Sequence, residues 1–374
     1  MFNPEKPKIA ILCSGLDSKL RGYETHQRTL FECLKVERCD VKLFKRTGKR
    51  IKSYEVPLRT PSEDSLICKL VSLFYETPHQ LQKSFFSVAF VLYVLVFRKK
   101  FKYLLIIEPG VARVISRIRK LLPGNPDIVY THGIGNGPEY YFGFSDQIIE
   151  VSNPAFLKAH AYASKKESSQ PLHCIPHFVN QEFLFREEPD AEFINSLKKK
   201  FGIQTRNVAL HVGLICKDPK NVGYIIEEIA RLPKDWSLLL VGEVEDSELL
   251  NIGKHALGDR FLQITLPRDR VREAYYVSDV MVFASINEGF GIVIIEGLSS
   301  GLPVLLPNIP LYQWIVNSNN DSLYNLESGG LSNAIQQRMT NPNLIRKQKE
   351  TGRLLVQANY SWNAVRKAYL SLLK

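Results

Sequence analysis

Residues Ser278 to Pro307 read SDVMVFASINEGFGIVIIEGLSSGLPVLLP, and this stretch decides the class of fold. Two short apolar runs, Val280–Ala284 and Pro303–Leu306, are bounded by polar residues, proline or glycine, as buried strands are. A turn with glycines follows the first run, and we expect a helix to begin near Gly291. A strand, a helix and a second strand in this order favour a parallel sheet covered by helices.

The run Ile292–Ile295 leaves a second interpretation open, because its β-branched residues favour a strand by propensity alone. A buried strand followed by a turn is therefore the alternative. If the helix forms, its first amides point at the strand ends, where they can hold a phosphate or a sugar hydroxyl. Glu288 in the turn and Glu296 further along could then face one ligand, the first suited to a sugar and the second to a ribose.

Strands and helices alternate on both sides of this stretch. The other expected strands are Ile9–Leu12, Val41–Phe44, Leu104–Ile107, Ile128–Tyr130, Gln147–Val151, Val208–Val212, Leu238–Val241 and Phe261–Leu266. The expected helices are Glu24–Lys35, Arg113–Leu121, Tyr224–Ala230, Ser247–Leu257 and Arg270–Tyr276. Residues 174–190 are typical of a linker. We therefore predict two Rossmann-like α/β domains, residues 1–178 and 179–359, facing each other across a cleft.

Charge is distributed unevenly along the chain of 374 residues. Residues 1–130 hold 24 Lys and Arg against 12 Asp and Glu, whereas the whole chain has 49 against 38. A basic first domain favours an anionic partner such as a phospholipid surface, with a solvated basic surface as the alternative. No aromatic and basic recognition module is evident, so we expect no nucleic-acid partner.

The segment Phe85–Phe97 is apolar and runs directly into Arg98, Lys99 and Lys100. It is too short to span a bilayer. One interpretation is a buried helix, and the other is a helix that rests on the membrane interface with a basic flank.

Cysteine spacing and the N-terminal residues indicate the compartment. The six cysteines form neither a CxxC pair nor a metal-ligand spacing, which favours a reduced environment and no metal site. The first residues, MFNPEKPKIAIL, carry proline and charges where a signal peptide would have its apolar run. We expect a cytoplasmic protein, docked at the inner face of the membrane if the second interpretation of Phe85–Phe97 holds.

The segment EGFGIVIIEGLSSGLPVL, which begins at Glu288, resembles the E-x7-E signature of the retaining glycosyltransferases of family four, which have the GT-B fold. Further blocks resemble that family in both halves of the chain. They are KIAILCSGLDSKLRGYETHQRTL, IVYTHG, SDQIIEVSNPAFLKAHA, CIPHFVNQEF, HVGLICKDPKNVGYIIEEIARL, WSLLLVGE and YYVSDVMVFAS. The resemblance thus covers nearly the whole chain, and it implies an acceptor-binding first domain and a donor-binding second domain. It also implies that a terminal helix over residues 360–374 packs back on the first domain.

The resemblance assigns the donor side of the site. Glu288 would contact the donor sugar, Glu296 the ribose, and the backbone of Phe290, Gly291 and Ile292 the sugar and phosphates. Lys220 would meet the diphosphate, where negative charge grows as the glycosidic bond breaks, and a surface lysine without a ligand is the alternative.

Three further assignments concern the loops after strands. The family usually places an arginine directly after the glycine that corresponds to Gly213; this chain has Leu214, and we expect Lys217 to replace that cation. Gly22 belongs to a glycine-bearing loop after the first strand. His132 ends a strand where the family has a histidine that contacts the donor sugar or the acceptor, and a loop histidine bonded to backbone is the alternative.

The expected activity is transfer of a sugar, with retention of configuration, from a UDP- or GDP-sugar to the hydroxyl of a glycan or lipid-linked acceptor, in glycan or cell-envelope biosynthesis. Glu288, His132 and Lys220 are the expected catalytic residues. No Asp-x-Asp pair suited to a nucleotide-bound cation is evident, so we expect neither a metal nor another cofactor. A non-catalytic GT-B binding protein and a sugar-nucleotide epimerase are the alternatives.

Overall fold

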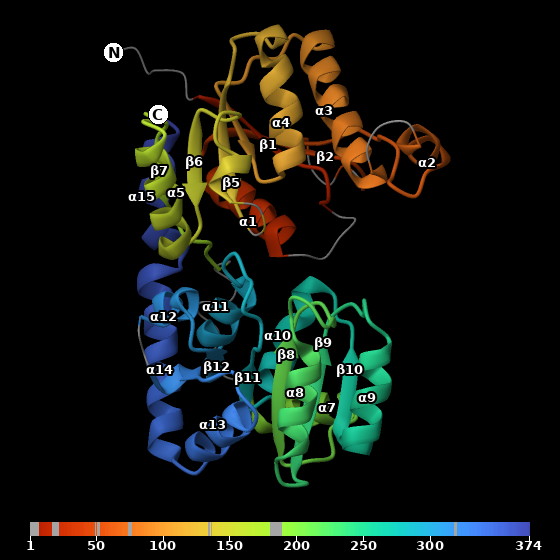
Figure 1. Cartoon of the computed structure of the whole chain (residues 1–374), viewed down its shortest axis with the longest axis vertical. Coiled ribbons are helices and arrows are strands. Elements are labelled where there is room, and N and C mark those ends of the chain that lie inside the picture. The colour runs from red at the N-terminus through yellow and green to blue at the C-terminus, as the bar shows by residue number, and fades with distance from the viewer. Residues whose placement is uncertain are drawn as a thin grey trace. The chain divides into compact units, whose positions relative to one another are not determined.

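A computed structural model of the chain describes residues 7–16, 22–48, 50, 53–73, 77–133, 135, 137–179, 189–317 and 320–374. The chain folds into two compact units, and each is built on its own parallel sheet (Figure 1). Unit 1 comprises Met1–His177 with Arg366–Lys374, and unit 2 comprises Phe178–Val365. Most of the expected linker, at residues 180–188, lies outside the described residues.

Unit 1 contains a seven-stranded sheet in the order β3-β2-β1-β4-β5-β6-β7, and every pair of neighbouring strands is parallel. The strands are β1 (Lys8–Cys13), β2 (Asp40–Lys45), β3 (Glu55–Pro57), β4 (Tyr103–Ile106), β5 (Asp127–His132), β6 (Gln147–Glu150) and β7 (Leu172–Cys174). The α-helices are α1 (Gly22–Val36), α2 (Leu66–Ser72), α3 (Pro78–Val96), α4 (Pro109–Ile118) and α5 (Asn153–Lys165). The strand order reverses between β1 and β4, as in a Rossmann sheet.

Unit 2 contains a six-stranded parallel sheet in the order β10-β9-β8-β11-β12-β13. The strands are β8 (Asn207–Val212), β9 (Trp236–Val241), β10 (Phe261–Ile264), β11 (Val280–Val282), β12 (Val304–Pro307) and β13 (Leu323–Tyr324). The helices are α7 (Ala191–Phe201), α8 (Val222–Ala230), α9 (Glu248–Leu257), α10 (Val271–Tyr276), α11 (Ile292–Ser299), α12 (Pro310–Ile315), α13 (Gly330–Met339) and α14 (Pro342–Asn359).

The chain ends with α15 (Trp362–Leu372), whose last residues belong to unit 1. Tyr369 Oη lies 3.3 Å from His26 Nε2 of α1, and Arg366 Nη1 lies 3.7 Å from Oε1 of Glu37, the residue after α1. The C-terminal residues thus complete the hydrophobic and polar packing around α1.

The predicted fold class, two Rossmann-like α/β domains, is confirmed, and each expected strand overlaps an observed one. Three short strands were not expected: β3, β7 and β13. All three lie at the outer edges of their sheets, where a strand pairs on one side only and can be short. Such segments lack the apolar run that identifies a buried strand in a sequence. The cleft between the domains stays a prediction.

The predicted helix after Gly291 is also confirmed, and the strand interpretation of Ile292–Ile295 is wrong. Gly291 adopts the left-handed conformation, with φ 86° and ψ 66°, and α11 follows it directly. All but one of the residues in α11 are buried, and Gly297 lets it approach the sheet so closely that a Cβ there would lie 2.6 Å from Met281 Sδ. Packing of this kind overrides the preference of β-branched residues for strands.

The apolar segment Phe85–Phe97 forms most of α3, which begins with a capping box between Thr77 and Gln80. One face, including Phe86, Phe90 and Val94, is buried in the core of unit 1. The buried-helix interpretation therefore describes only that face, because the opposite face is exposed. Among the residues that the structure describes, no helix has the length and apolarity needed to cross a membrane.

Two glycines bring the chain together at the carboxyl ends of β8 and β9. Gly213 has φ 152° and Gly242 has φ 155°, and a Cβ on Gly242 would lie only 1.9 Å from the carbonyl oxygen of Gly213. The Gly213 amide donates to the carbonyl of Val241 at 3.0 Å. Neither position tolerates a side chain without a shift of the loop after β8.

His211, on β8, is fully buried next to this loop. Its Nδ1 lies 3.2 Å from the carbonyl of Val282, and no polar group of the described residues meets its Nε2. Burial, with a smaller contribution from the Lys220 charge, lowers the pKa of His211 to about 4, against the opposing effect of the Val282 hydrogen bond. The ring is therefore neutral in the folded chain at pH 7.

We expect Gly242→Ala to lower the melting temperature by several degrees, because the added methyl group must displace the Gly213 backbone at a cost of at least about 2 kcal/mol. Gly223→Ala is the matched control, since its Cβ would lie 3.7 Å from Leu249 Cδ2 and alanine favours the helix. Equal melting temperatures in thermal unfolding would contradict the close approach of the two loops.

The depressed pKa of His211 predicts acid sensitivity. His211 binds a proton near pH 6.5 in the unfolded chain but only near pH 4 in the folded chain. The free energy of unfolding therefore has its full value above pH 6.5 and decreases as the pH is lowered from 6.5 to 4. Protonation of His211 accounts for a loss of about 3 kcal/mol in the free energy of unfolding over this pH range. Urea unfolding at pH 7 and pH 4.5 should show a smaller loss for His211→Gln than for the wild type. The exposed His255→Gln should behave as the wild type, and an unchanged loss in His211→Gln would refute the assignment.

Candidate functional site

The carboxyl edge of the unit 2 sheet brings Lys220 and Glu288 together. Glu288 follows β11 and Lys220 precedes α8, and both loops lie at one edge because β8 and β11 are parallel neighbours. Lys220 Nζ forms an ion pair with Glu288 Oε1, and the side chains are 20% and 9% exposed. A carboxylate and an ammonium group, partly shielded from water, thus share one position where a ligand can reach them.

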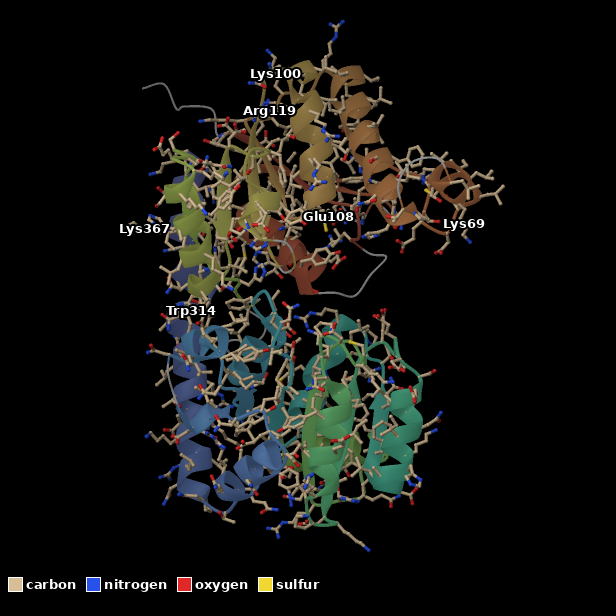
Figure 2. The ribbon with its side chains drawn as sticks, in the orientation of Figure 1. Lys69, Lys100, Glu108, Arg119, Trp314 and Lys367 are labelled. Carbon is tan, nitrogen blue, oxygen red and sulfur yellow. The ribbon has the colours of Figure 1, made fainter. Side chains whose placement is uncertain are left out.

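Aromatic rings pack against Phe290 in the turn after Glu288. Phe290 is buried, and its ring meets those of Trp314 and Tyr360 edge to face at 6.0 and 5.6 Å. Trp314 is labelled in Figure 2. Gly291 has no side chain to cap α11. In the first turn Ile294 N donates to the Gly291 carbonyl at 2.9 Å, so the amides of Ile292 and Val293 are the ones that can meet water or a ligand.

Glu296 lies on α11 and is only 1% exposed, with both carboxylate oxygens bonded. Arg268 donates from Nη1 to Oε2 at 2.9 Å and pairs through Nη2 with Oε1, and Tyr275 Oη lies 3.0 Å from Oε2. Burial lowers the pKa of Arg268 and raises that of Tyr275. A carboxylate has lone pairs for further hydrogen bonds, so this arrangement can still accept ligand hydroxyls.

Sequence reasoning did not identify Arg268 and Tyr275. Tyr275 belongs to the segment Arg270–Tyr276, which was predicted only as a helix, and Arg268 lies just before it. Nothing in the spacing of these residues points to Glu296. The available signal was indirect: a buried carboxylate on an apolar helix needs a cation or hydrogen-bond donors. Which residues supply them depends on the loop after β10.

Gly213 lies close to Lys220 but Lys217 points elsewhere. A Cβ on Gly213 would lie 3.5 Å from His211 Nε2 and 3.8 Å from Lys220 Cε. Lys217, in contrast, is 57% exposed, and its Nζ lies 2.6 Å from Glu248 Oε2 and 3.7 Å from Asp246 Oδ2. The hydrogen bond to Glu248 raises the pKa of Lys217. The structure does not join Lys217 to the Lys220–Glu288 pair, so its proposed role at a diphosphate stays a prediction.

In unit 1, His132 ends β5 and is oriented by a carboxylate. Its Nδ1 lies 2.8 Å from Glu150 Oε2 on β6, and the Tyr141 hydroxyl donates to the other oxygen of Glu150 at 2.5 Å. The Tyr141 ring also stacks on the imidazole at 4.3 Å. Because the carboxylate favours a proton on Nδ1, Nε2 is the acceptor atom of the neutral ring.

Gly22 is the first residue of α1, and residues 17–21 of the loop before it lie outside the described residues. The described part of that loop is held by Glu108, at the end of β4. Its carboxylate accepts hydrogen bonds from Ser14 N at 2.9 Å, Ser14 Oγ at 2.5 Å and Gly15 N at 3.3 Å. Figure 2 labels Glu108.

Part of unit 2 is similar to a known protein family. Residues 206–341 match the sequence model of a family described as Glycosyl transferases group 1. N-acetyl-alpha-D-glucosaminyl L-malate synthase of Bacillus anthracis is 26% identical over 166 residues, which are 43% of this chain and 41% of that protein. The lipopolysaccharide core biosynthesis glycosyltransferase LpsE of Rhizobium meliloti is 29% identical over 153 residues, 40% of this chain and 44% of that protein. The matches therefore span less than half the length of each curated relative.

Two solved structures share the fold over nearly their whole length. Sucrose-phosphate synthase from Thermosynechococcus elongatus superimposes with a TM-score of 0.76 at 19% identity, covering 98% of both chains. HepE from Anabaena, in complex with UDP and glucose, superimposes with a TM-score of 0.76 at 14% identity, covering 98% of this chain and 99% of that one. The predicted GT-B fold is therefore confirmed, and residues 206–341 match the sequence model of the glycosyl transferases group 1 family.

Proposed function

We propose that this chain is a glycosyltransferase that moves a sugar from a nucleotide-sugar donor to a hydroxyl acceptor. The observation that carries the proposal is the Lys220–Glu288 pair beside the uncapped amides of α11, with Glu296 further along the same helix. This arrangement offers a cation and helix amides to phosphates and two carboxylates to hydroxyls. The group 1 family match covers these residues, and HepE, which shares the fold, was solved with UDP and glucose.

Each side chain has a distinct role in the proposed donor site for a UDP- or GDP-sugar. Glu296 accepts hydrogen bonds from the ribose while Arg268 and Tyr275 balance its charge. Glu288 accepts from the sugar hydroxyls. Lys220 leaves Glu288 and contacts the diphosphate, where its charge is needed most as the leaving group departs.

The proposed reaction retains the anomeric configuration and uses no metal. The acceptor oxygen forms a bond to the anomeric carbon on the face from which the diphosphate leaves, and the departing phosphate oxygen takes the hydroxyl proton. Lys220 and the first amides of α11 stabilise the charge that develops on that oxygen. The protein thus contributes orientation and electrostatic stabilisation rather than a covalent nucleophile.

The acceptor side of the proposal concerns unit 1. We propose a glycan or lipid-linked acceptor in glycan or cell-envelope biosynthesis, at the inner face of the membrane. The supporting observations are the basic charge of residues 1–130 and the name of the relative LpsE. In this proposal His132, fixed by Glu150, contacts the donor sugar or the acceptor through Nε2, and Gly22 lies in a loop that lines the site.

A thermal-shift panel with UDP, GDP, ADP, CMP and NAD tests the donor site. One nucleoside diphosphate should raise the melting temperature by several degrees, because a ligand that binds only the folded chain stabilises it. The shift should be lost in Glu296→Ala and reduced in Lys220→Met, but kept in Lys234→Met, a matched change at an exposed lysine. No shift with any nucleotide would favour the non-catalytic binding protein.

Once the donor base is known, turnover and stereochemistry test the mechanism. We expect Glu288→Gln to lower kcat by about 100-fold or more, because transition-state contacts are lost while most donor binding is kept. Glu227→Gln, an exposed glutamate on α8, should leave kcat unchanged. NMR of the first-formed product should show the anomeric configuration of the donor. An inverted product would refute the retaining route, and an epimerised sugar formed without acceptor would identify an epimerase.

A further inference from the structure

Apolar side chains exposed to solvent gather on one pair of helices in unit 1. Of the seventeen exposed large hydrophobic residues that the structure describes, nine belong to α2, α3 and the residues that cap their C-terminal ends. We call these nine the α2–α3 apolar face; they are Leu66, Ile67, Leu70, Leu73, Val88, Leu92, Leu95, Val96 and Phe97. Such a concentration is unusual on a folded surface and indicates a binding function.

On α3 the exposed residues follow the helical repeat. Val88, Leu92, Leu95 and Val96 have the spacing i, i+4, i+7 and i+8, so they form one stripe opposite the buried Phe90 and Val94. Their exposed fractions are 47, 56, 41 and 72%. The helix thus anchors itself in the core with one face and presents a second apolar face that unit 1 does not cover.

The shorter helix α2 repeats this pattern. Leu66, Leu70 and the capping residue Leu73 have the spacing i, i+4 and i+7, and they are 74, 53 and 75% exposed, whereas Cys68 is fully buried. The two helices contact each other, and Figure 1 shows α2 at the outer end of unit 1 next to α3. The exposed leucines of α2 therefore do not pack into the core of unit 1.

The charges on this helix pair are all positive. Neither α2 nor α3 contains an Asp or Glu, and the exposed Lys69 and the exposed run Arg98–Lys100 supply basic side chains. Figure 2 shows Lys69 at the α2 end of the pair and Lys100 at the far end of α3. Before α2, Glu63 is paired with His79 at 2.8 Å and is followed by Asp64, and the sequence has a third acidic residue, Glu76, between the two helices.

We propose that the α2–α3 apolar face docks on an anionic lipid bilayer, with its Leu, Ile and Val side chains at the acyl boundary and Lys69 and Arg98–Lys100 among the headgroups. Basic side chains next to an aliphatic face are complementary to such a surface. A protein partner would favour Trp, Tyr and Arg anchors with a polar rim. This face instead offers mainly aliphatic side chains and Lys, which suits a fluid, negatively charged surface.

This inference deepens the proposed function, because it rests on an acceptor held at a membrane, but the binding itself requires neither donor nor turnover. Docking would bring unit 1 to the surface in which a lipid-linked acceptor is anchored. A weak, reversible association is expected, since the face is too shallow to insert as a spanning helix does.

Co-sedimentation of the full chain with vesicles tests the proposal. Vesicles of phosphatidylcholine with about a third phosphatidylglycerol should bind the wild type at least about tenfold more strongly than pure phosphatidylcholine, and raising the salt from 0.1 to 0.5 M should weaken that binding. Leu70→Glu and Leu92→Glu should each reduce binding by about tenfold or more. Leu157→Glu, at a leucine of α5 that is 58% exposed, is the matched control and should bind as the wild type does.

Charge is tested separately by reversing Lys69, Lys99 and Lys100 to Glu, with Lys158→Glu on α5 as control. Equal vesicle binding by Leu92→Glu and Leu157→Glu would overturn the proposal. So would a dimer of the wild type, measured by light scattering, that Leu92→Glu dissociates, because the face would then belong to a second copy. A nucleotide shift that persists in variants unable to bind vesicles separates failure of this inference from failure of the donor site.

Discussion

Burial of the Glu296 charge is the constraint on which the arrangement of unit 2 depends. Glu296 is the one ionisable residue on α11, a helix whose other residues are apolar except Ser299 and are almost all buried. A carboxylate in such surroundings destabilises the fold by several kcal/mol unless it is paired and hydrogen-bonded. Arg268 and Tyr275 meet that requirement, and they come from the connection between β10 and α10. One carboxylate therefore fastens α11 to the connection between β10 and α10.

The position of α11 in turn sets the chemistry at the carboxyl edge. Gly297 brings the helix against β11 and β12, and the left-handed Gly291 starts the helix directly after the turn that carries Glu288. Lys220 meets Glu288 there because the loop after β8 is held by the contact of Gly213 with Gly242. Two carboxylate–cation pairs thus lie at one edge, each partly shielded from water, where electrostatic interactions are stronger than in bulk solvent.

Unit 1 is organised by a different balance between burial and exposure. The core takes one face of α3 and leaves the other face, with the stripe of α2, to solvent. At the end of β5, in contrast, the carboxylate of Glu150 bonds both His132 and Tyr141. Unit 1 therefore combines a hydrogen-bonded strand end at His132 with an apolar surface on α2 and α3 that unit 1 itself does not cover.

The sequence by itself determined the strands other than β3, β7 and β13, the parallel α/β class and the helix after Gly291, because apolar periodicity and glycine positions act within a few residues. It also predicted Glu288, Glu296 and Lys220 as donor-site residues, through a resemblance in two stretches of chain. Only the tertiary structure paired Glu296 with Arg268 and Tyr275, turned Lys217 towards Glu248, and buried His211 beside Gly213. These partners are separated in sequence and meet because parallel strands align their carboxyl ends, so strand order and loop geometry, rather than local pattern, decide which charge neutralises which.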